Sequence, residues 1–255
     1  MAIGDIRQKL SDVVAALTAG DPSELPTGIV DRLYRFYKFI DLLPLRRITK
    51  SRIPTGSVVI DVGAHMGFAT SLLSRRVGNG GLVFAIEPQT RCAPIIRRRC
   101  PSAMVVTAAA HRADGRRELL TGGTFGTDSR ITEQSGETEV IALDTLLEDT
   151  GDRNVSFIKI DVQGGELNVL LGASAMLNRH RPDLFIELWH EGLRRAGHSL
   201  DELITLLGEI GYVPSRVSLA GSKLVIDSRF RRRAAKPASF DQLFVHESRL
   251  SAGIN

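Results

Sequence analysis

The stretch VVIDVGAHMG, residues 58–67, decides how the rest of the sequence is interpreted. Its first five residues are apolar except for Asp61, and Gly63, His65 and Gly67 follow them. An apolar strand that runs into a glycine-containing turn and then a helix is typical of the first βα unit of an open parallel sheet. Ligands of such sheets bind beyond the carboxyl ends of the strands. The turn is therefore a candidate cofactor site.

On both sides of this stretch the apolar pattern predicts the secondary structure. Short apolar runs without alternation are separated by longer helix-like segments, which indicates βαβ units and a mainly parallel sheet with helices on both faces. The expected strands are 58–62, 82–87, 104–108, 156–161 and 184–188, and the expected helices are 68–76, 90–99, 166–178 and 200–210. Three later runs also read as strands, and the first two of them can form a hairpin: 212–219, 223–226 and 242–247. A glycine-containing excursion at 121–138 reads as a long loop.

The N-terminal part has a different, helical pattern. Apolar spacing predicts helices over 6–17 and 27–40. The second of these carries Tyr34, Phe36, Tyr37 and Phe39, a cluster that favours packing onto a domain but could also line a substrate opening. We expect an N-terminal helical extension at 1–52 and one α/β domain at 53–255.

Composition excludes several classes of protein. The chain is 43% hydrophobic and 24% charged, as in ordinary globular proteins. No apolar run approaches the roughly 20 residues of a membrane span, and no secretory leader pattern is present, so we expect a cytoplasmic protein. The spacing of Cys92 and Cys100 matches neither a metal site nor a disulfide framework. A net charge of +4 permits a nucleic-acid partner, but basic runs are more often solvated faces, so such a partner is not expected.

Two acids at strand ends favour S-adenosylmethionine (SAM) over a dinucleotide. The spacing after the first strand is D-x-G-x-x-x-G and not the G-x-G-x-x-G of dinucleotide folds. A carboxylate at Asp61 would repel a pyrophosphate but attract a sulfonium or ammonium group. Glu87, at the end of the second strand, can accept hydrogen bonds from both ribose hydroxyls, although an acid before Pro88 can also simply belong to a turn.

His65 occupies a turn position at which a positive φ is common. His, Asn and Asp tolerate this conformation better than most residues other than glycine. We expect His65 to act through its backbone and to have no part in proton transfer.

An ordered set of motifs between Val58 and Tyr212 resembles the FkbM-like family of SAM-dependent methyltransferases. DVGAHMG is similar to the family's D-V-G-A-N-x-G, with His65 in place of asparagine, and FAIEP, AAAHRADG, VIALDTLL, IKIDVQGGELNVLLGA and RPDLFIELWH resemble its later segments in order. Two positions depart further: Ala142 replaces a threonine, and Gln163 replaces a glutamate beside the expected reaction centre.

The resemblance implies a fold, a cofactor site and a reaction. The fold would be the class I SAM-methyltransferase fold, a Rossmann-like, mainly parallel sheet of seven strands. The reaction would be O-methylation of a sugar or natural-product hydroxyl. The residues expected at the cofactor are Asp61, Gly63, Ala64, His65, Gly67, Glu87, Pro88, Ala109 and Asp161.

Methyl transfer to a hydroxyl also calls for a base. The candidates at strand ends are Asp161, Glu187 and His190. His190 is preferred because an imidazole pKa suits neutral pH, with Glu187 orienting it. Strand alternation, however, places the two on opposite faces. Asp161 could instead be the base, cap the following helix, or bind a divalent metal ion together with the other two. The metal question stays open.

The sequence therefore predicts a SAM-dependent O-methyltransferase acting on a small-molecule or saccharide hydroxyl. The alternatives are an RNA methyltransferase, suggested by the basic runs, and a non-catalytic SAM-binding or NAD-binding module.

Overall fold

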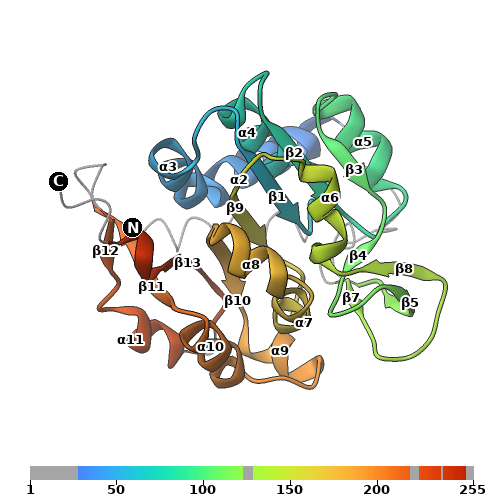
Figure 1. The fold of residues 1–255 in the computed structure, drawn as a ribbon. Helices are drawn as coiled ribbons and strands as arrows, with labels where there is room; N and C mark the ends of the chain where they lie inside the picture. Colours follow the sequence, from blue (N-terminus) through green and yellow to red (C-terminus); the bar gives the residue numbers. More distant parts are fainter. Residues whose placement is uncertain (1–27, 123–128, 219–223, 237, 251–255) are drawn as a thin grey trace.

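The computed structural model describes residues 28–122, 129–218, 224–236 and 238–250, and its centre is one eight-stranded sheet (Figure 1). The strand order is β12-β11-β13-β10-β9-β1-β2-β3. Neighbours from β10 to β3 are parallel, whereas β13, β11 and β12 are added antiparallel. The bounds are β1 (Val58–Val62), β2 (Leu82–Ile86), β3 (Met104–Val106), β9 (Val155–Ile160), β10 (Asp183–Leu188), β11 (Tyr212–Val217), β12 (Leu224–Ile226) and β13 (Phe240–His246).

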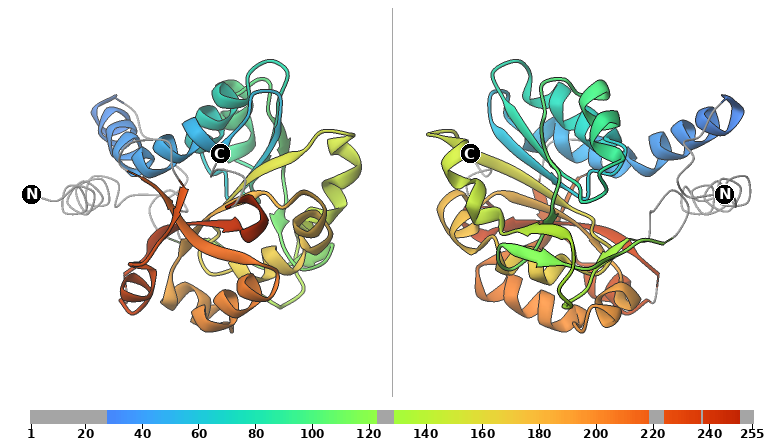
Figure 2. Two further views of the ribbon diagram at one scale, coloured as in Figure 1. Left: turned by 60° about the vertical axis from the view of Figure 1, so that its left-hand side comes forward. Right: turned by 90° about the vertical axis from the view of Figure 1, so that its right-hand side faces the viewer.

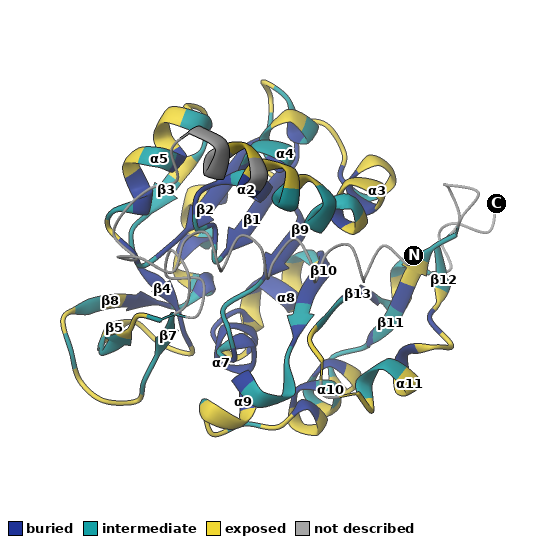
Figure 3. Cartoon of the chain, turned by 180° about the vertical axis from the view of Figure 1, so that it is seen from behind, coloured by how far each residue is buried: buried dark blue, intermediate teal, exposed yellow. Residues whose placement is uncertain are grey.

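Helices cover both faces of this sheet. Successive side chains of a strand point to opposite sides, so a strand that is apolar throughout needs a covering layer on each face. Ile60 belongs to the core that includes residues of α7 (Glu166–Leu171), α8 (Ser174–His180) and α10 (Leu200–Glu209). Val59 belongs to the opposite core, with residues of α3 (Leu43–Arg52) and α4 (Phe68–Val77). Residues of α5 (Cys92–Arg99) pack with Ala85 of β2. Figure 3 shows the central strands buried and the outer sides of the helices exposed.

Helix α2 (Gly28–Asp41) lies on the side of the molecule opposite α10 (Figure 2). The ring of Tyr34 packs edge-on against Phe68, the first residue of α4, with centroids 5.7 Å apart. Tyr34 is 2% exposed. Tyr34 therefore attaches α2 to the start of the helix that follows the glycine turn, whereas Phe36 and Phe39 of the same cluster are exposed.

Smaller elements extend the carboxyl side of the sheet. β4 (Ala109–Ala110), β8 (Thr138–Ile141) and β5 (Gly115–Arg117) form a three-stranded sheet, and β6 (Leu119–Leu120) pairs with β7 (Arg130–Ile131). The remaining helices are α6 (Leu147–Thr150), α9 (His190–Arg195) and α11 (Phe230–Ala234). The segment 121–138 was expected as a loop, and the short strand β7 within it is a correction.

Most expected elements are confirmed, and the main differences concern the strand number that the resemblance implies and two helices. The sheet has the eight strands that the apolar pattern predicts, one more than the seven that the resemblance implies, and β12 is its edge strand. The expected helix 166–178 is two helices that meet at Gly172, where an added Cβ would lie 2.0 Å from the carbonyl oxygen of His111. Helix α3 was not expected, because its arginines and lysine obscure the apolar period. The helix expected at 6–17 lies outside the described residues.

Among the residues that the structure describes, no helix combines the length and apolar character needed to cross a bilayer.

Candidate functional site

A pocket of about 1150 Å³ opens at the carboxyl ends of β1, β2, β9 and β10. The turn after β1, the end of β2, the start of β4, the strand β7 and helix α2 also contribute to its lining. Ligand pockets in proteins usually have about 300–1,000 Å³. This one is slightly larger than that range.

The turn after β1 approaches β9 closely, and glycine makes this possible. Gly63 has φ 76°, and a Cβ added there would lie 1.9 Å from the carbonyl oxygen of Asp161. His65 has φ 48°, which confirms the expected positive φ, and its Nδ1 lies 3.4 Å from the Tyr34 hydroxyl. Gly67, at φ 74°, precedes α4. The turn thus exposes backbone to the pocket.

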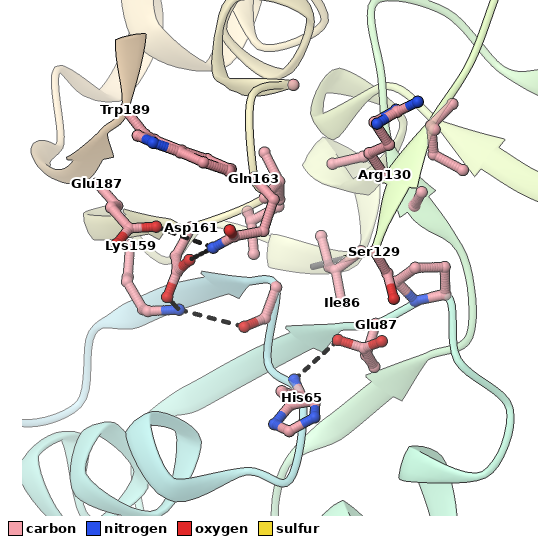
Figure 4. A pocket seen from close by; sticks show the side chains of 18 of the residues that line it. His65, Ile86, Glu87, Ser129, Arg130, Lys159, Asp161, Gln163, Glu187 and Trp189 are labelled. Atoms are coloured by element: carbon pink, nitrogen blue, oxygen red, sulfur yellow. Dashed lines mark hydrogen bonds and ion pairs between the residues drawn. The ribbon is translucent and has the colours of Figure 1, made fainter. Parts of the chain in front are cut away.

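Glu87 lies immediately after β2 and is 3% exposed (Figure 4). Its Oε2 accepts the backbone N–H of His65 at 2.8 Å, and its Oε1 accepts that of Gln89 at 3.0 Å. Burial raises the pKa of Glu87, although these two N–H groups lower it. An ionised carboxylate has about four acceptor positions. Each oxygen therefore keeps capacity for a hydroxyl of a ligand.

Asp61 does not line the pocket, which corrects its expected direct contact with a cofactor. It is fully buried, its Oδ2 accepts from the Thr70 hydroxyl at 2.7 Å, and its Oδ1 lies 3.3 Å from the Lys159 Nζ. The reason is the register: Asp61 and Lys159 are direct neighbours on β1 and β9. Asp61 therefore forms an ion pair with Lys159, and it is Lys159 that lines the pocket.

Lys159 joins the turn to the end of β9. Its Nζ donates to the carbonyl oxygen of Gly63 at 3.2 Å and lies 3.3 Å from the Asp161 Oδ2 (Figure 4). Burial by itself lowers the pKa of Lys159, but Asp161 and Asp61 outweigh it and raise the pKa above its ordinary value. The ammonium group is therefore kept charged beneath the pocket.

Asp161 and Glu187 come together at the ends of β9 and β10. The side-chain Nε2 of Gln163 donates to the Asp161 Oδ1 at 3.0 Å and to the Glu187 Oε2 at 2.9 Å (Figure 4). Gln163 has φ 58°, so the backbone turns sharply just beyond the strand. All three residues line the pocket.

The two carboxyl groups have opposite pKa shifts. Burial raises the pKa of Asp161, but Lys159 and Lys38 lower it more, so that it lies below its ordinary value. Burial, followed by the charges of Asp161 and Asp241, raises the pKa of Glu187 well above its ordinary value. Asp241 is the direct cross-strand partner of Glu187 on β13. Of the two groups, Glu187 therefore binds a proton more tightly.

His190 lies outside the pocket lining, at the start of α9. Its Nε2 is 2.5 Å from the backbone carbonyl oxygen of Ala234. The structure therefore does not bring it together with Asp161 and Glu187, and the strand alternation noted above is the reason. Within the described part of the chain, no group of three or more His, Cys, Asp or Glu side chains is arranged to hold a metal ion.

The other expected cofactor residues divide into two groups. Pro88 and Ala109 line the pocket, next to Glu87 and at the start of β4. Ala64 and Gly67 belong to the turn but are not part of the lining.

Sequence reasoning missed several lining residues. Lys38 of α2 is one of them. Tyr34 and Tyr37 of the same helix also line the pocket, which is the second role considered above for the aromatic cluster. Trp189 stands beside the carboxyl pair (Figure 4), and its proximity in sequence to Glu187 could have indicated it. No sequence signal indicates Asp241, because an antiparallel strand from the end of the chain brings it in.

A family model matches the greater part of the chain. The family model described as the Methyltransferase FkbM domain matches residues 61–214. No curated protein matches the sequence significantly. Among solved structures, an FkbM methyltransferase from Methylobacillus flagellatus is similar at 19% identity and a TM-score of 0.46, covering 93% of this chain and 58% of that chain.

Two further solved structures are similar at the level of the fold. An O-methyltransferase from Bacillus cereus in complex with SAH has 18% identity and a TM-score of 0.42, with 94% of this chain and 90% of that chain covered. A TehB-like SAM-dependent methyltransferase from Corynebacterium glutamicum has 11% identity and a TM-score of 0.44, with 85% and 97% covered. The family model spans more than half of the chain. The chain belongs to the FkbM family of methyltransferases.

Proposed function

We propose that the protein transfers a methyl group from SAM to a hydroxyl oxygen of a small molecule or saccharide. The observation that carries this proposal is one pocket with two chemically different ends. Glu87 lies at one end, and Asp161, Glu187 and Lys159 lie at the other. This arrangement suits a nucleoside cofactor beside an acceptor that must lose a proton.

The chain's residues fit the cofactor. Glu87 retains acceptor positions for the two ribose hydroxyls, in addition to the N–H groups of His65 and Gln89. The turn at Gly63 exposes backbone without a side chain. Pro88 and Ala109 flank the same end of the pocket. Bound SAM would supply an electrophilic methyl group on a sulfonium sulfur.

The acceptor would lie at the end of the pocket beside Trp189 and the carboxyl pair. Alignment of the hydroxyl with the methyl group contributes a large share of such catalysis. We assign Glu187 as the base that takes the hydroxyl proton, because its raised pKa makes it a stronger base than Asp161. Asp161, ionised beside Lys159, would orient the hydroxyl.

The helical extension is part of this proposal. Lys38 of α2, a helix within the expected N-terminal extension at 1–52, lines the pocket and lowers the pKa of Asp161 at the acceptor end. We therefore assign the extension a role in acceptor binding, with the remaining chain holding the cofactor.

Two measurements test the function. Calorimetry with SAM, SAH and NAD should give binding to the first two only; NAD binding alone would contradict the proposal. Incubation with SAM and panels of hydroxylated small molecules, saccharides and RNA, followed by mass spectrometry, should give products heavier by one methylene. Methylated RNA would favour the alternative substrate class, and SAM binding without any turnover would favour a non-catalytic module.

A further inference from the structure

Gln163 makes a contact that the glutamate usual at this position in the family could not make. One amide nitrogen donates both of its hydrogens to two different carboxylates, Asp161 at 3.0 Å and Glu187 at 2.9 Å. An ionised carboxylate only accepts hydrogen bonds. A glutamate here would add a third negative charge where the amide now joins two acids.

The charges around this pair favour a retained proton. Glu187 lies beside Asp161, which directly follows β9, and opposite Asp241 on β13. The cations lie on the Asp161 side. They are Lys159, shared with Asp61, and Lys38, paired with Asp41 at 3.0 Å. Two carboxyl groups held this close, with the positive charge next to only one, cannot both ionise readily.

The same pair faces the place where a sulfonium would lie. The pocket lining runs from Glu87 past Gly63 to Asp161 and Glu187. If the ribose of the cofactor lies at Glu87, its sulfur lies toward the carboxyl pair. A positive charge nearby lowers the pKa of a carboxyl group, so it competes with a proton bound there.

We propose that Gln163 is a positioning residue whose amide holds Asp161 and Glu187 as a pair that shares one proton and releases it to solvent when a sulfonium binds. This inference rests on the proposed function. The O–H bond of the carboxyl group breaks and the proton goes to bulk water. The positive charge of the sulfonium then balances the second negative charge of the pair. Glu187 is then free to accept the proton of the acceptor hydroxyl. The cofactor itself would therefore prepare the base.

The test is calorimetry of the full chain with SAM and with SAH, needing no knowledge of the acceptor. Each binding enthalpy is measured in several buffers that differ in ionisation enthalpy, at pH values from about 5 to 8, because the dependence on the buffer gives the protons released. SAH has the same amino and carboxyl groups but a neutral sulfur. We expect SAM to release up to about one proton more than SAH at some pH in this range.

Three variants test which residues cause the difference in proton release between SAM and SAH. Glu187→Gln should abolish the difference between SAM and SAH, because it removes the group that holds the proton. Gln163→Leu should reduce the difference at least severalfold, because the two acids are no longer held together. Gln163→Glu should keep or increase it, because it adds negative charge. Thermal unfolding and SAH affinity show whether each variant is folded.

The outcomes separate this inference from the proposed function. If SAM and SAH bind but release equal numbers of protons at every pH, the shared proton is overturned and the proposed function stands. If the wild-type difference persists unchanged in folded Gln163→Leu, the role of Gln163 is overturned. If neither ligand binds, the proposed function and this inference are both overturned.

Discussion

Gly63 sets the distance between the turn after β1 and the end of β9. A Cβ at this position would overlap the backbone oxygen of Asp161, and backbone cannot move aside as a side chain can. The close approach also lets Lys159 reach the Gly63 carbonyl oxygen. Because Gly63 has no side chain, the turn after β1 can lie directly against Asp161.

We expect Gly63→Ala to destabilise the fold far more than a comparable substitution elsewhere. Gly151→Ala is the matched control, because Gly151 also has a positive φ, 58°, but no atom lies within 4 Å of an added Cβ. The control should lose about 1–2 kcal/mol from the left-handed conformation alone. Gly63→Ala should lose at least that much again. Equal losses in urea unfolding would contradict the close approach.

The position of Glu87 leads to a prediction on cofactor affinity. Glu87→Ala should weaken SAM and SAH binding by about 1–3 kcal/mol, because the hydrogen bonds that the ribose hydroxyls donate to a charged acceptor are lost. Glu209→Ala, an exposed acid at the end of α10, is the control and should bind normally. Unchanged affinity of Glu87→Ala in calorimetry would refute the assignment of the ribose.

At the level of elements, the sequence predicted the strands better than the site. Strands β1, β2, β9 and β10 are mostly apolar without strict alternation because helices cover both faces of the sheet, and this pattern is visible in the sequence alone. The break at Gly172 and the placement of Asp241 depend on backbone and strands from distant parts of the sequence. No local pattern records such contacts.

The first turn of α7 contains a buried acid whose titration should make the stability of the fold depend on pH. Glu166 is 1% exposed, and its Oε1 accepts the backbone N–H of Gly164 at 3.1 Å. Burial raises the pKa of Glu166 to about 7, from an ordinary value of 4.5. Between these two pH values the folded chain keeps a proton that the unfolded chain has lost, so stability falls as the pH rises through this window.

Glu166→Gln should remove this pH dependence, because an amide has no proton to lose. Relative to wild type, the variant should gain about 2–4 kcal/mol of unfolding free energy on going from pH 4 to pH 8, since each unit of pKa difference corresponds to about 1.4 kcal/mol. Denaturant unfolding across this range measures it, with the exposed Glu209→Gln as control. Parallel stability curves for wild type and Glu166→Gln would show that the acid titrates normally.

At the scale of the whole molecule, one buried acid connects three distant parts of the chain. Asp183, at the start of β10, is fully buried. Its Oδ2 lies 2.5 Å from the Nε of Arg52 at the end of α3, and its Oδ1 lies 3.1 Å from a guanidinium nitrogen of Arg249 near the C-terminus. The helix before the sheet, the sheet itself and the chain's last described turn meet at this group.

Asp183→Asn should lower the unfolding free energy by about 3 kcal/mol, because it leaves two arginines without their buried partner. Asp152→Asn, in an exposed turn, should change it by less than about 0.5 kcal/mol. Chemical denaturation of both variants at neutral pH measures the difference. A loss no larger than that of Asp152→Asn would mean that the arginines are satisfied by solvent.

The order of the strands determines when this protein can become active during its synthesis. β13 is the last strand in the described part of the chain, yet it is inserted between β10 and β11. Until the ribosome has released it, β10 and β11 both present an unpaired edge, and such edges are prone to aggregation. Asp241 reaches Glu187 only with this strand. A nascent or truncated chain that ends before residue 240 therefore holds an incomplete pocket, and synthesis must proceed through β13 before the pocket lining is complete.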